Sequence, residues 1–311
     1  MNYRKRLREQ GKEIRRVKRL LSCARRVPLT KKAENAYGEL TGDSHLIHMF
    51  PRLARQAGIG FKRCPVRGAH MAAIAGNLEY GIYLLANPDN EGLIIHQKTT
   101  FPRPVYQQKR LNLLNVPSWL YGGIEQNGAQ GALKIKVTAH VRKIIVLESV
   151  LEIKSQKEPC EPLRKSLVTP VTSSIELRME DLINNISWMH RQSASGTQLT
   201  RGLVQSYAPA TLVRILEKAY GDVDIPQRPL PINLAMETTW YEPAHEGIIE
   251  VETRMTREKL LKNSAIYDFS VRFMQDDAIL ATTEIRSASN KPLDKDRIDG
   301  VRTLPTYRRP Q

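Results

Sequence analysis

The feature that most constrains the fold of this chain is a faint internal repeat, at an offset of roughly 135 to 140 residues. An Arg-Gly pair opens each copy: Arg67-Gly68 in the first half and Arg201-Gly202 in the second. Apolar residues follow each pair at the spacing of a helix face, so each half is expected to contain one long apolar helix. Two such units in 311 residues give domains of about 150 residues, which is an ordinary size.

After each helical stretch the apolar period changes to two, which is typical of half-buried strands. Residues 99–104 match residues 238–243 at a shift of 139, and their prolines are expected at strand ends or edges. The alternating residues are Leu133, Ile135, Val137, Ala139 and Val141 in the first half, and Tyr267, Phe269, Val271 and Phe273 in the second. An antiparallel sheet with one apolar face must be covered, and the long helix is the expected cover. The sequence therefore predicts an α+β fold that occurs twice.

Turn and linker signals divide the chain further. Residues 127–128 and 275–277 are expected to form hairpin turns between strands. Residues 154–169 contain prolines and charges but no hydrophobic period, so they are expected to link the two halves. The expected division is a basic N-terminal arm (1–28), a first domain (29–153), a linker (154–169), a second domain (170–290) and a basic C-terminal tail (291–311).

The formal net charge of +16 is unevenly distributed, because residues 1–26 contain eleven Lys and Arg residues against two glutamates. Such an arm suits a solvated basic helix, an acidic partner or organelle targeting, and the glutamates count against a mitochondrial presequence. No stretch of about 20 apolar residues is present, so no membrane span is expected. The three cysteines, Cys23, Cys64 and Cys160, have no disulfide or metal spacing, which favours a reducing compartment. A cytoplasmic location is expected, with a mitochondrial one as the alternative.

The candidate chemistry lies in residues 37–54, where an aspartate and a histidine stand five positions apart. The pattern there consists of Tyr37, Leu40, Thr41, Gly42, Asp43, Ile47, His48 and Ala54. It resembles the hydratase 2 motif of the MaoC-like (R)-specific enoyl-CoA hydratases. Two positions depart from that motif: His45 stands where the family has Asn, and Leu46 where it has Pro.

The resemblance continues through residues 58–68 and 99–106, and covers roughly residues 33–150. The second half is similar only in architecture, since the region around 175–189 has no corresponding Asp-His pair. The resemblance implies a double hot-dog fold with two antiparallel sheets, each wrapped around a long central helix. It also implies one catalytic half and one degenerate half, which together imitate the dimer formed by single hot-dog subunits. A homodimer of the whole chain is left open.

Hydration of a trans-2-enoyl thioester explains why these residue types are needed. The reaction requires a base to deprotonate water, an acid to protonate C2, and stabilisation of charge on the thioester oxygen. Asp43 is the candidate base and His48 its partner. The backbone N–H of Gly68, at a helix N-terminus, is the candidate donor to the oxygen.

Three further residues are expected to support substrate binding. His45 is expected either to supply the hydrogen bond of the family's Asn or to mark a site that has lost its reaction. Arg67 and Arg103 are expected either to contact the phosphates of a carrier or to be solvated. His70, one turn into the helix, is expected to be packed rather than catalytic.

The expected function is reversible hydration of a trans-2-enoyl thioester, carried on coenzyme A or acyl carrier protein, to the (R)-3-hydroxyacyl thioester. Thioester hydrolysis is a related alternative, because folds are shared between activities. A non-catalytic protein that binds acyl thioesters or nucleic acid is the alternative from another class. Nucleic-acid binding is not favoured, because the basic arm has no interleaved aromatics beyond Tyr3. Nothing in the sequence indicates a metal or redox cofactor.

Overall fold

The computed structural model describes residues 12, 14–19, 21–22, 27, 29–56, 61–86, 94–109, 116–127, 132–154, 160, 162–180, 196–224, 227–262 and 264–309. Most of the expected basic arm therefore lies outside the described residues. So do residue 128 of the first expected turn, much of residues 154–161, and the part of residues 175–189 that follows residue 180.

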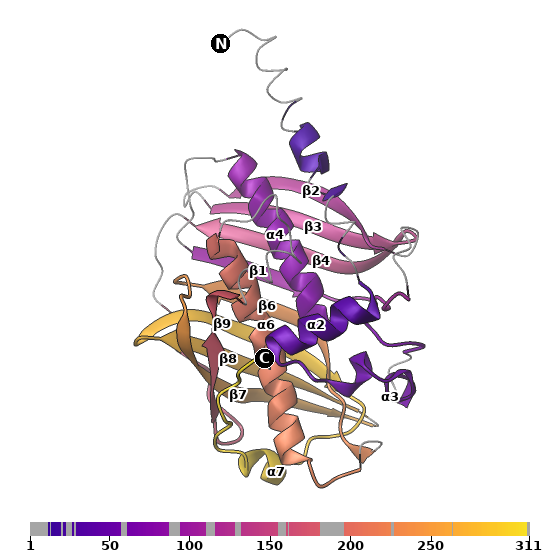
Figure 1. Ribbon diagram of the computed structural model, residues 1–311, viewed down its shortest axis with the longest axis vertical. Helices are drawn as coiled ribbons and strands as arrows, with labels where there is room; N and C mark the ends of the chain where they lie inside the picture. Colours follow the sequence, from indigo (N-terminus) through magenta and orange to yellow (C-terminus); the bar gives the residue numbers. More distant parts are fainter. Residues whose placement is uncertain are drawn as a thin grey trace.

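One nine-stranded antiparallel sheet forms the centre of the described part of the molecule, with the strand order β2-β3-β4-β1-β6-β9-β8-β7-β5 (Figure 1). The strands are β1 (Ile94–Thr100), β2 (Ser118–Asn127), β3 (Ala132–Val141), β4 (Ile144–Lys154), β5 (Val171–Leu177), β6 (Ile232–Trp240), β7 (Gly247–Leu261), β8 (Ser264–Gln275) and β9 (Ala278–Ser289). The single sheet differs from the two sheets expected. The reason is that β1 pairs with β4 on one side and with β6 on the other, which joins the two halves. Because β6 also pairs with β9, neither β1 nor β6 has an open edge.

At the junction of β1 and β6, two residues that correspond in the internal repeat lie opposite each other. Lys98 on β1 lies opposite Glu237 on β6, and these residues are separated by the shift of 139 that aligns residues 99–104 with 238–243. Their side chains form an ion pair with Nζ 3.1 Å from the carboxylate. Equivalent strands therefore meet in antiparallel pairing at the centre of the sheet.

Two long helices lie on the same face of this sheet (Figure 1). Helix α4 (Gly68–Ala86) packs on β3 and β4, and helix α6 (Gly196–Ala219) packs on β6, β9 and α4. Helix α4 is buried along nearly its whole length, because most of its residues are apolar. It begins at Gly68 as predicted, whereas α6 begins five residues before Arg201, so the second Arg-Gly pair lies inside its helix.

The predicted alternation is confirmed in both halves. Ile135, Val137 and Ala139 are fully buried on β3, as are Tyr267 and Val271 on β8. The hairpin expected at residues 275–277 is also present, because the two residues between β8 and β9 have φ angles of 49° and 63°. Positive φ at both positions is characteristic of the tight turns that suit strand twist.

Shorter helices accompany the two long ones in the described part of the chain. They are α2 (Lys31–Thr41), the 3₁₀ helix η1 (Leu46–His48), α3 (Pro51–Gln56) and α7 (Lys295–Asp299). The C-terminal segment, expected to be a basic tail, is packed against β5, where Thr303 bridges to Thr172 and Tyr307 to Ile175. Among the described residues, none of the helices has the combination of length and hydropathy needed to span a membrane.

Candidate functional site

Two short helices hold the Asp43–His48 segment in place. Helix α2 ends at Gly42, whose φ of 76° is in the left-handed region and turns the chain so that Asp43 follows directly. Three residues later η1 begins, with His45 as its N-cap and His48 as its last residue. Asp43 and His48 are both buried and both line one cavity.

The surroundings of His48 fix its protonation. Its Nδ1 lies 2.9 Å from the carbonyl oxygen of Pro65, and because a carbonyl can only accept, Nδ1 carries the proton and donates. Burial and the nearby Arg67 lower the pKa of His48 below its usual value, so the ring is neutral near pH 7. The second ring nitrogen, Nε2, is then an unprotonated acceptor. His48 is therefore prepared to take up a proton.

Asp43, unlike the neutral His48, is held in its charged form. One carboxylate oxygen accepts a hydrogen bond from the backbone N–H of His45 at 3.1 Å, and the other lies 3.3 Å from Nε of Arg67. Burial alone would raise the pKa of Asp43, but Arg67, His48 and His45 together hold it below its usual value. Asp43 is therefore an ionised carboxylate at neutral pH.

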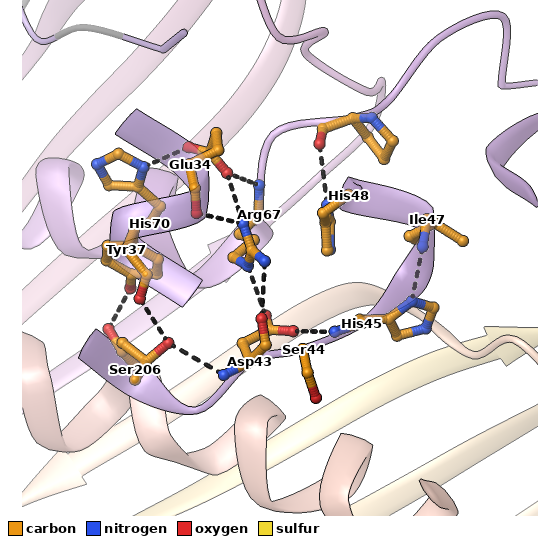
Figure 2. A network of polar contacts seen from close by, with 12 residues as sticks. Glu34, Tyr37, Asp43, Ser44, His45, Ile47, His48, Arg67, His70 and Ser206 are labelled. Carbon is orange, nitrogen blue, oxygen red and sulfur yellow. Dashed lines mark hydrogen bonds and ion pairs between the residues drawn. The ribbon is translucent and has the colours of Figure 1, made fainter. Parts of the chain in front are cut away.

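Arg67 lies at the centre of a buried charge network (Figure 2). Its side chain is almost inaccessible and donates from Nη2 to the backbone oxygen of Asp43 at 2.7 Å, while its backbone N–H donates to Glu34 at 2.9 Å. Glu34 also contacts His70 at 2.6 Å, and His70 is stacked on Tyr37 with ring centroids 4.3 Å apart. Burial opposes ionisation of Glu34, but His70 and Arg67 reverse this and lower its pKa. Arg67 therefore neither reaches a carrier's phosphates nor is solvated, which corrects both expectations.

His45 also lines the cavity, and both of its ring nitrogens are hydrogen-bonded to the backbone. Its Nδ1 accepts from the backbone N–H of Ile47 at 3.3 Å, and its Nε2 donates to the carbonyl of Pro231 at 3.1 Å. Burial and the neighbouring His48 lower its pKa to about 4, so it is neutral near pH 7. Through its bond to Ile47, His45 is the N-cap of η1, a position in which Asn is also favoured.

The cavity has a volume of about 260 Å³ and is lined by residues of both halves. Asp43, His48 and Gly68 lie in its wall, and the exposed Arg103 also lines it. Gly68 is the first residue of α4, so its N–H has no acceptor within the helix. A Cβ on Gly68 would lie 3.3 Å from the ring of Phe101, so only glycine leaves this wall uncrowded. Helix α6 contributes Pro209, Leu212, Val213 and Leu216.

Contacts from the second half and the C-terminal segment fix the Asp43–His48 segment. Tyr37 donates to Ser206 on α6, and Ser44 donates to Glu217 on the same helix at 2.7 Å. Tyr307 donates to the backbone oxygen of Glu39.

The Tyr307 ring also lies so close to Gly42 that a Cβ there would be 2.8 Å from it. Sequence reasoning missed these partners, because their contacts depend on how the halves pack. The sequence does indicate that Glu34 is buried, because it lies three residues before Tyr37 and seven before Thr41, on the same face of α2.

Comparison with known proteins gives similarity in structure only. No protein-family model and no curated protein matches this sequence. Among solved structures, a MaoC-like dehydratase aligns with a TM-score of 0.49 and 10% identity, over 85% of this chain and 94% of its own. A Mycobacterium tuberculosis protein described as having a double hot-dog fold aligns with a TM-score of 0.48 and 11% identity, over 85% and 93%. An acyl-CoA thioesterase II, TesB2, from Mycobacterium marinum aligns with a TM-score of 0.44 and 9% identity, over 71% and 91%.

Proposed function

We propose that this protein catalyses reversible hydration of a trans-2-enoyl thioester to the (R)-3-hydroxyacyl thioester. The observation that carries the proposal is the pair Asp43 and His48 in the wall of one cavity, the first ionised and the second neutral with Nε2 as its free acceptor. A charged carboxylate and a neutral imidazole can together bind one water, and the imidazole can take up its proton.

In the proposed reaction, water binds between the Asp43 carboxylate and Nε2 of His48. His48 takes the role of base that the sequence predicted for Asp43. The water proton moves to Nε2 as the oxygen bonds to C3 of the enoyl chain, and the electron pair of the double bond shifts towards the thioester oxygen. The N–H of Gly68 donates to that oxygen as it becomes negative. Return of the proton from His48 to C2 completes the addition, and reversal of the steps eliminates water.

Arg103 is the proposed contact for the carrier. It is exposed and lines the cavity, so its guanidinium can meet a phosphate of coenzyme A or of a carrier protein without leaving solvent. Arg67 cannot share this role, because it is already bound to Asp43 and Glu34.

Thioester hydrolysis is the second candidate, and the state of Asp43 favours it. A carboxylate kept ionised by Arg67 can orient a water for attack on the thioester carbonyl as well as on C3. Gly68 would stabilise the oxyanion in either reaction. The same groups therefore support both candidates, and the product must separate them.

The test follows both products in one assay. Purified protein is incubated with crotonyl-CoA and longer trans-2-enoyl-CoA esters, while loss of the enoyl absorbance and release of free thiol are recorded together. Hydration predicts loss of the absorbance without free thiol and a product of (R) configuration on chiral chromatography. Release of thiol at the rate of absorbance loss would replace hydration with hydrolysis, and absence of both from a folded protein would contradict the proposal.

A further inference from the structure

We propose that Leu216 on α6 limits the length of the acyl chain, and that the chain runs from the site towards the core of the second half and ends at Leu216. This inference rests on the proposed function, because it takes an acyl thioester as the ligand. The substrate class it names is an unsubstituted, straight acyl chain of medium length that ends near Leu216.

Three cavities meet at Leu216. The site cavity of about 260 Å³ is lined there by Leu212, Val213 and Leu216. A second cavity of about 20 Å³ shares Leu212 and Leu216 with it, together with Pro231. A third, of about 40 Å³, shares Val213 and Leu216. Leu216 is the α6 residue common to all three walls, so its side chain separates the site from the space beyond.

The chemistry of the two outer cavities decides which one continues the path. Apart from Thr253, the second cavity is lined by apolar residues: Val168, Val171, Leu212, Ile215, Leu216, Pro231, Met255, Phe269, Leu293 and Ile298. The third includes Glu217 and Arg228, whose charges a hydrocarbon chain would separate from water. A methylene chain is therefore favoured in the second cavity and disfavoured in the third.

The polarity of the site cavity gives the chain its direction. Asp43, His48 and Gly68 lie in the part of the wall contributed by the first half, where the thioester must react. The residues from α6 are apolar and come from the second half. With the thioester at the first group, the tail of the acyl chain points towards Leu216.

The position of Leu216 in the cavity wall should set the chain length that binds most tightly. Each newly buried methylene group tightens binding about fourfold, so affinity should rise with chain length until the chain reaches Leu216. Leu216→Ala opens the wall to the second cavity, and the affinity maximum should move to longer chains by about two methylene groups. For those longer chains the variant should bind about 16-fold more tightly than the wild type, which is about fourfold for each of two methylene groups.

The experiment measures binding without chemistry. Thioether analogues of saturated acyl-CoA, from butanoyl to hexadecanoyl, can be neither hydrated nor hydrolysed, and their dissociation constants are measured by titration calorimetry. Leu216→Met, which keeps the volume, should retain the wild-type profile. Leu203→Ala is the matched control, because it is the same truncation on α6 at a buried position that lines none of these cavities. Circular dichroism verifies that each variant is folded.

Each outcome bears on the proposal separately from the proposed reaction. A shift to longer chains in Leu216→Ala alone supports the inference, even if the enoyl esters are not hydrated. An unchanged profile in folded Leu216→Ala, an equal shift in Leu203→Ala, or no binding of any analogue by the wild type would overturn it. Hydration of the enoyl esters together with an unchanged binding profile would support the proposed reaction and contradict the role of Leu216.

Discussion

The two halves of the molecule use the same Arg-Gly pair in different ways. In the first half Arg67 stands just before α4 and contacts Asp43 and Glu34. In the second half Arg201 lies inside α6, with its guanidinium 5.9 Å from the ring centre of Tyr80. Both halves have a long helix on the sheet, and a carboxylate and a histidine line the cavity wall beside the start of α4. The residues directly before α6 lie outside the described part of the chain, so the difference between the two halves is seen at the two arginines.

The second half contributes shape and support to the site. Residues of α6 line the apolar part of the cavity, and Ser206 and Glu217 hold Tyr37 and Ser44. We therefore expect the first half to determine the chemistry and the second to determine the geometry and chain length.

Arg67→Met should be strongly destabilising, because it leaves Asp43 and Glu34 buried with fewer compensating groups. Removal of one partner from a buried ion pair costs about 3–5 kcal/mol. Urea unfolding measures this as a fall in the free energy of unfolding. Arg103→Met is the control, since Arg103 is exposed and its loss should change stability by less than about 0.5 kcal/mol. Equal stability of the two variants would show that Arg67 is not the centre of a buried network.

His45→Asn should reduce the loss of stability in acid. The folded-state pKa of His45 is about 4, whereas the unfolded ring titrates near 6.5, so the unfolded state binds a proton that the folded state does not. The free energy of unfolding should therefore decrease as the pH falls from 6.5 to 4, with His45 contributing up to about 3 kcal/mol. Asn retains an N-cap but does not titrate. Thermal or urea unfolding across this range should give a shallower dependence for the variant, and identical slopes would contradict the assignment.

Arg103→Ala should weaken binding of coenzyme A esters by about tenfold, which corresponds to one charge-assisted contact. The difference between the variant and the wild type should diminish at high salt, because an exposed charge is screened. Titration calorimetry at two ionic strengths measures both effects. If affinity is unchanged at low salt, the carrier's phosphates lie elsewhere.

Tyr307→Phe should have the smallest effect. The variant keeps the ring against Gly42 but loses the hydrogen bond to Glu39, which contributes about 1 kcal/mol. A fall of a few fold in kcat with KM unchanged is expected, since the contact positions Asp43 and does not touch substrate. Tyr307→Ala should lower kcat further, and full activity of that variant would show that the C-terminal segment has no positioning role.

The sequence predicts the elements of the fold better than their assembly. The alternation in β3 and β8 and the start of α4 at Gly68 are readable, because periodicity and glycine placement are local properties. The joining of β1 and β6 into one sheet is not, since strand periodicity does not say which edges pair.

The candidate site is divided in the same way. Asp43 and His48 can be found from their spacing and resemblance to a motif. The roles of Arg67, Glu34 and Tyr307 depend on contacts between distant segments, which one sequence does not encode locally. The sequence also leaves the role of His45 open, and the two hydrogen bonds of its ring identify it as a cap.

Asp43 and His48 are proposed to act together on one water, and the rates of four proteins show whether they do. Initial rates of enoyl-CoA hydration are measured for the wild type, Asp43→Asn, His48→Gln and the double variant, with folding verified for each. Each single variant should lose about 10²- to 10⁴-fold in kcat, and the double variant should be little worse than either. Hydration at the wild-type rate by either folded single variant would contradict it.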